Sequence, residues 1–145
     1  MKLNGFYSYL TLIILVASSC TKNNLVENST IDGDWHLVKY EHSTNGENVN
    51  FIRNDIVWNF NENSNKLIVE INISATTLEN YESIYIGLDS GIYEYSIIEK
   101  NGVSYLMIDN NKFGNILISP NKLIINKKEG SYGAENNLST WNFEH

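Results

Sequence analysis

The sequence predicts an all-β fold, an antiparallel up-and-down barrel or closed sandwich of about eight strands. Short segments alternate apolar and polar residues, as half-buried strands do. Asn, Gly, Asp and Ser interrupt these segments at short intervals, which is typical of consecutive antiparallel hairpins. There is no sustained helical period, and closure of the sheet would remove exposed strand edges.

Three strands are expected in the first half of the domain. The first is 35–42 (WHLVKYEH), and the second is 56–61 (IVWNFN), with its aromatic residues on one face. The third, 66–74 (KLIVEINIS), has the clearest period-two alternation, with Ile68 as its one exception. The residues NENSN at 61–65 join the second and third strands as a hairpin.

Five further strands are expected after residue 90. They are IYEYSIIE, VSYLMID, FGNILIS, KLIINKK and STWNFEH, at 92–99, 103–109, 113–119, 122–128 and 139–145. The intervening KNG, DNN and SPN supply residues that tolerate positive φ or fix a tight corner. Such short links predict that consecutive strands pair in a meander.

Segment 75–90 allows two interpretations. It could form a short helix over Leu78, Tyr81 and Glu82, or an additional strand at 84–88. We favour the strand, because isoleucine and tyrosine are enriched in strands.

Residues 1–19 have the parts of a secretory signal: a positive start at Lys2, an apolar core and small residues at its end. The apolar core is shorter than the ~20 residues that a membrane-spanning helix needs. Small residues directly before Cys20 resemble the lipobox of bacterial lipoproteins. That resemblance implies cleavage before Cys20 and acylation of its thiol, with two or three acyl chains that anchor the protein firmly. The alternative is a plain signal peptide with an incidental cysteine.

The remainder is expected to be a tether at 20–30 and one domain at 31–145. Residues 20–30 are polar and offer little apolar surface to bury. The formal net charge of the chain is −7, so its composition disfavours binding to nucleic acid or docking onto anionic lipid through charge. Membrane association is therefore expected through lipid on Cys20.

The domain resembles the lipocalin-like lipoproteins of the Bacteroidota. Gly33 and Trp35 match the Gly-X-Trp of the first strand in lipocalin-like barrels, where the tryptophan closes one end. The resemblance implies an outer-membrane lipoprotein, and the absence of an acidic cluster after Cys20 favours the periplasmic side. The matching segments are 31–41, 56–69, 90–97 and 106–126.

One departure from this family lies at the end of the last strand. Such domains often end in an aromatic residue followed by an arginine that packs over the tryptophan. Here Phe143 is followed by Glu144 and His145. We expect Arg53 or His145 to take the place of that arginine, if any residue does.

No catalytic site or metal site is expected. The sequence has no G-x-S-x-G nucleophile motif and no cysteine besides Cys20. His36 and His42 are expected on one face of the first strand, ~20 Å apart, too far to share a metal ion. Asp32 and Asp34 are expected to cap a turn. We therefore predict a protein that is not an enzyme and uses no cofactor.

The remaining candidates are aromatic side chains on the predicted inward faces. An eight-stranded barrel is filled by its side chains or holds one small ligand, and so many large residues favour filling. The functional hypothesis is a small apolar ligand at one mouth, lined by Trp58, Tyr93 and Tyr95, with tyrosine hydroxyls orienting it. The alternative is a filled barrel that docks onto another envelope protein through outward isoleucines. The inward aromatic residues are Trp35, Trp58, Phe60, Tyr93, Tyr95, Trp141 and Phe143, and the outward isoleucines are Ile68, Ile92, Ile98 and Ile124.

Overall fold

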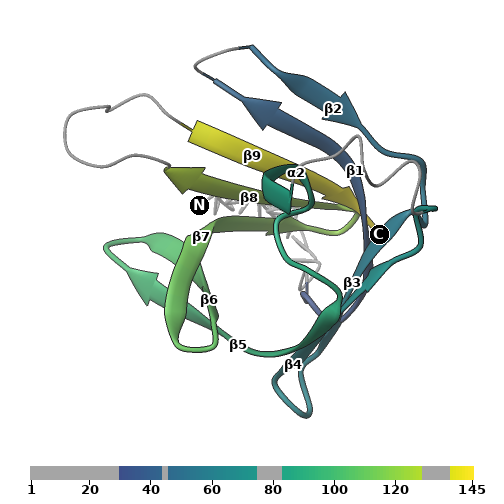
Figure 1. The fold of residues 1–145 in the computed structure, drawn as a ribbon. Helices are drawn as coiled ribbons and strands as arrows, with labels where there is room; N and C mark the ends of the chain where they lie inside the picture. The colour runs from purple at the N-terminus through teal and green to yellow at the C-terminus, as the bar shows by residue number, and fades with distance from the viewer. Residues whose placement is uncertain (1–29, 44–45, 75–82, 129–137) are drawn as a thin grey trace, which may run out of the picture.

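The computed structural model describes residues 30–43, 46–74, 83–128 and 138–145. This part of the chain forms a closed β-barrel with one short helix at an end (Figure 1). The elements are β1 (Gly33–His42), β2 (Asn48–Asn50), β3 (Ile56–Asn61), β4 (Lys66–Ile71), α2 (Ser83–Ile86), β5 (Gly91–Lys100), β6 (Val103–Ile108), β7 (Asn111–Ser119), β8 (Lys122–Lys128) and β9 (Leu138–Glu144).

The predicted antiparallel barrel is confirmed. From β3 to β9 each strand pairs with the next one along the chain, and β1 pairs with both β3 and β9 to close an eight-stranded ring. In Figure 1, β9 lies between β8 and β1. The short β2 was not expected, and it pairs with β1 through Tyr40↔Val49.

The hairpin turns are built as their residues predicted. Asn65 has a φ of 53° between β3 and β4. Between β5 and β6, Asn101 and Gly102 have φ values of 56° and 73°, as a two-residue hairpin turn requires. Asp109 and Asn110, at 47° and 64°, form the next turn.

A β-bulge in β1 changes which side chains face inward. The register with β9 shifts between Leu37 and Lys39, so that Leu37 and Tyr40 are both buried. His36 therefore points out of the barrel, whereas His42 lies on the same side of the strand as Tyr40. The expectation that the two histidines share a face is wrong, because period-two alternation fails at a bulge.

The strand favoured at 84–88 is also wrong. Residues 83–86 form the helical turn α2 instead. β4 and β5 pair directly through Leu67↔Tyr93 and Val69↔Gly91, so no edge between them is open to an additional strand. The alternative helix over Leu78, Tyr81 and Glu82 lies outside the described residues.

Candidate functional site

The barrel interior is filled with aromatic side chains. Trp58 is fully buried at its centre, with ring centroids 4.9 Å from Phe143, 5.6 Å from Phe113 and 6.2 Å from Phe60. Its Nε1 is buried without a hydrogen-bond partner in the described structure. Trp58 therefore belongs to a packed core rather than to an open pocket.

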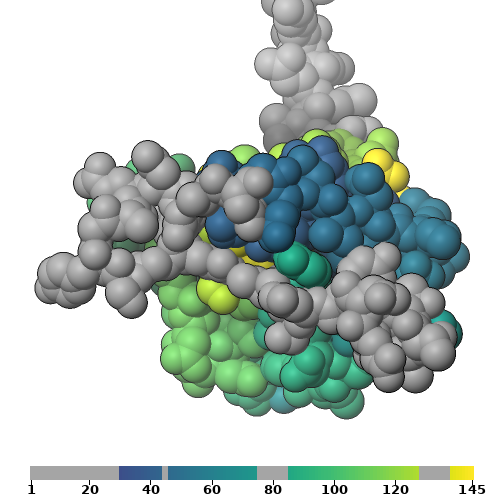
Figure 2. Space-filling view, turned by 45° about the horizontal axis from the view of Figure 1, so that its top comes forward, coloured from purple at the N-terminus to yellow at the C-terminus, as the bar shows by residue number. Residues whose placement is uncertain are grey.

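Residues 85–88, which we call the mouth segment, close one end of the barrel. The indole Nε1 of Trp141 donates a hydrogen bond of 3.2 Å to the main-chain oxygen of Tyr85, and Ile86 is buried in the core. Gly87 has a φ of +88°, and a Cβ there would lie 3.1 Å from Trp141 Nε1 and 3.2 Å from Trp58 Cζ2. Glycine therefore lets the backbone approach both indoles. Figure 2 shows the teal surface of this region between the blue surface of β1 and β2 and the green surface of later strands.

Trp35 lies near the start of β1, with His145 against it. The ring centroids of the two residues are 5.0 Å apart in an edge-on arrangement. Arg53 donates a 2.9 Å hydrogen bond to the main-chain oxygen of His145, and Trp35 Nε1 donates one of 2.7 Å to the Ile31 oxygen. A Cβ on Gly33, whose φ is +113°, would lie 3.0 Å from His145 Nε2. His145 thus packs edge-on against the indole of Trp35, and Arg53 holds its backbone.

The structure does not bring Trp58, Tyr93 and Tyr95 together in one cleft. Tyr95 packs edge-on against Phe60 at 5.0 Å, and burial, helped by nearby carboxylates, raises its pKa to about 12. It borders a cleft of about 350 Å³ with Ser64, and no residue of the mouth segment borders that cleft. Tyr93 is half-buried, and its hydroxyl donates a 2.9 Å hydrogen bond to the Asp89 oxygen. Burial, followed by the negative charges of Asp89 and Asp109, raises the pKa of Tyr93.

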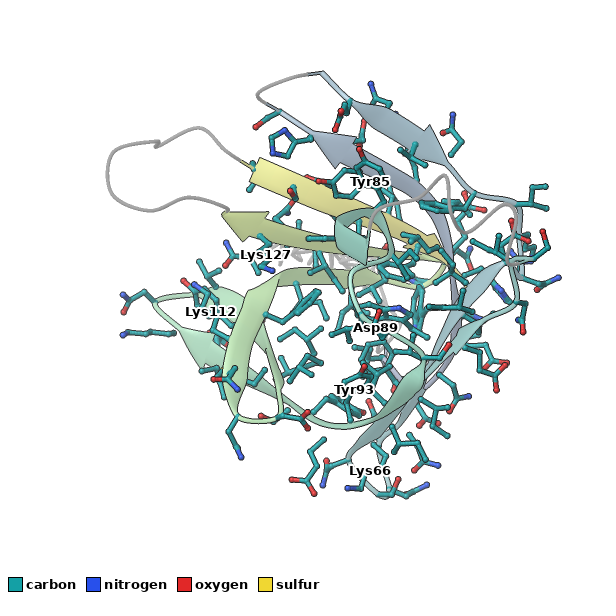
Figure 3. The ribbon with its side chains drawn as sticks, viewed as in Figure 1. Lys66, Tyr85, Asp89, Tyr93, Lys112 and Lys127 are labelled. Carbon is teal, nitrogen blue, oxygen red and sulfur yellow. The ribbon has the colours of Figure 1, made fainter. Side chains whose placement is uncertain are left out.

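Tyr93 instead borders a cleft beside the mouth segment, which we call the mouth cleft. Its volume is about 370 Å³, within the range of small-molecule sites. Figure 3 shows Tyr93 near the middle of this view, with Lys112 and Lys127 together on one side of the barrel. The residues that border it include Leu88, Tyr93, Ile108, Lys112, Phe113 and Lys127.

A second hollow lies in the barrel wall next to the first, and we call it the wall cleft. It has a volume of about 420 Å³ and is bordered by Tyr105, Lys112, Phe113, Asn115, Asn126 and Lys127. Lys112, Phe113 and Lys127 border both clefts. The two hollows are therefore adjoining parts of one surface that runs from the mouth over the wall.

A bend in β7 produces these hollows. The β6–β7 register shifts between Leu106 and Met107, and the pairing of β7 with β8 begins only at Asn115↔Asn126. A Cβ on Gly114 would lie 2.7 Å from the main-chain oxygen of Asn126, so only glycine permits this approach. Sequence reasoning missed Lys112, Phe113 and Lys127 as site residues, although Gly114 within a strand was a signal for a bulge or bend.

Neither a metal cluster nor a membrane-spanning helix occurs in the described part of the chain. No three His, Cys, Asp or Glu side chains there are grouped closely enough to hold a metal ion. No helix among those residues is long and apolar enough to cross a membrane. Comparison with protein-family models, curated proteins and solved structures finds no match to this chain.

Proposed function

We propose that this protein is a non-enzymatic lipoprotein of the cell envelope whose lipocalin-like barrel binds one small, largely apolar ligand. Lipid on Cys20 would hold it at the periplasmic side of the outer membrane. The observation that carries the proposal is the mouth cleft, a concave site bordered by the partly buried Leu88 and Tyr93 and by the largely buried Ile108 and Phe113.

The ligand is proposed for the mouth cleft rather than for the barrel interior. Trp58 and Phe143 are fully buried, and their rings fill the centre of the barrel. A ligand in the interior would have to displace the mouth segment, whose Ile86 is buried and whose Tyr85 oxygen accepts a hydrogen bond from Trp141. Binding beside this segment needs no such displacement.

A second candidate function is docking onto another envelope protein. The observation that favours it is the exposure of large apolar residues on the outer face, with Ile92 exposed by 71% and Leu117 by 61%. Of the other outward isoleucines, Ile98 is 46% exposed, whereas Ile68 and Ile124 are only partly exposed.

Native mass spectrometry of the protein recovered from its own envelope tests the first proposal. The signal is kept for export, and Cys20→Ser removes the acylation site. We expect a reproducible small-molecule adduct. Leu88→Ala should lower the affinity for this ligand about fivefold, because truncation of a leucine in a binding cleft removes roughly 1 kcal/mol of apolar contact.

Leu117→Ala is the matched control. It makes the same substitution on the outer face, where Leu117 pairs with Ile124 of β8. The adduct should be unchanged in this variant. A bare protein mass, or an adduct lost equally in both variants, would contradict binding at the mouth. If another envelope protein is recovered with the wild-type chain and is lost only in Leu117→Ala, the docking alternative is supported.

A further inference from the structure

Two lysines border the clefts from neighbouring strands. Lys112 lies near the start of β7, and Lys127 lies near the end of β8 (Figure 3). Lys112 Nζ lies 3.9 Å from the ring centroid of Tyr105, and Lys127 Nζ lies 5.4 Å from that of Phe113. These aromatic contacts place both ammonium groups along the hollow.

Neither lysine has an acidic partner in the described structure. The ion pairs there join Lys39 to Glu41 and Lys66 to Glu94. Asp109 is the carboxylate that borders the mouth cleft, and its Oδ1 already accepts a 2.9 Å hydrogen bond from the Glu94 N–H. Among the described residues, no acidic side chain borders the wall cleft. In a protein with a net charge of −7, this is a local concentration of positive charge.

Polar and apolar groups are separated along the same hollow. Leu88 and Ile108 border the mouth cleft, while Asn115 and Asn126 border the wall cleft. Phe113 borders both clefts. An elongated molecule could therefore place an apolar end at the mouth and a polar end at the wall.

We propose that Lys112 and Lys127 form an anion-binding site, and that the ligand is an amphiphile with one anionic head group. The head, a carboxylate or a phosphate, binds the two ammonium groups and the neighbouring asparagine amides. The apolar tail lies on Phe113 and Leu88 in the mouth cleft. This inference rests on the proposed function and adds the charge and the orientation of the ligand.

Calorimetric titration with three eight-carbon probes tests the inference. Octanoate, octyl phosphate and octan-1-ol are added to the full chain carrying Cys20→Ser, purified without detergent. The two anions should bind about tenfold or more tightly than the alcohol at low salt, because charge-assisted hydrogen bonds are roughly twice as strong as neutral ones. Whichever anion binds more tightly identifies the head group as carboxylate or phosphate.

Lysine variants locate the site. Lys112→Gln and Lys127→Gln should each weaken binding of the anions about five- to tenfold and leave the affinity for octan-1-ol unchanged. Lys122→Gln is the matched control, because Lys122 lies on β8 as Lys127 does but at the other end of the strand, paired with Ser119. It should have no effect.

Two results would overturn the inference. Equal affinity for octanoate and octan-1-ol, with no effect of either lysine variant, would remove the anion site but keep apolar binding at the mouth. If none of the three probes binds, the amphiphile is wrong as a ligand class. The proposed function would then depend on the adduct in the native mass spectrum.

Discussion

Gly87→Ala tests whether the mouth segment is packed against the core. At a φ of +88°, an alanine costs about 1–2 kcal/mol relative to glycine. Its Cβ would lie 3.1 Å from Trp141 Nε1 and 3.2 Å from Trp58 Cζ2, so these indoles must move by a few tenths of an ångström. Overpacking of this kind adds about 1 kcal/mol, at the lower end of its usual range. We expect the free energy of unfolding to fall by about 2–3 kcal/mol.

Gly102→Ala separates the two contributions. Gly102 has a φ of +73° in the turn between β5 and β6, with no atom within 4 Å of its Cβ position. The cost there should be the conformational one alone, about 1–2 kcal/mol. Urea unfolding followed by tryptophan fluorescence measures both variants. Equal losses of stability in the two variants would refute the packing of residue 87 against the indoles.

Two further predictions concern titration. The stability of the fold should fall as the pH drops below 6.5, because burial and then the charge of Arg53 lower the pKa of His36, so that the unfolded chain binds the proton more readily. His36→Gln should flatten this part of the pH profile of urea unfolding. An unchanged profile would show that His36 does not cause the loss of stability below pH 6.5. The phenol of Tyr95 should titrate near pH 12, mainly because it is buried. Ultraviolet titration of the wild type and Tyr95→Phe should differ by one phenol in that range, and a difference near pH 10 would contradict its burial.

The barrel could be predicted from the sequence because its signals are local. Alternation from Leu67 to Val69 and the turn residues Asn101 and Gly102 each specify their own part of the chain. The three residues of β2 are too few to show a period, and the bulge after Leu37 reverses alternation without a marker in the sequence. The local pattern therefore predicts the number and order of the strands in the ring, but it does not predict for every strand which side chains point inward.

The candidate site was harder to predict because it depends on contacts between distant segments. Tyr93 borders the mouth cleft, whereas Trp58 lies in the packed core. Lys112 and Lys127 are 15 residues apart and border the same clefts because the pairing of β7 with β8 begins only at Asn115. No period in either strand indicates where that pairing begins. The apolar sequence of residues 84–88 favoured a strand, whereas burial of Ile86 in the barrel end decided its structure.

The most direct test of a filled barrel that binds at its rim is an amide and indole NMR spectrum recorded during titration with octanoate. We expect the signals of Leu88, Lys112, Phe113 and Lys127 to shift, while the indole N–H of Trp58 stays unchanged. A shift of the Trp58 indole without shifts at the two lysines would place the ligand inside the barrel and contradict the account.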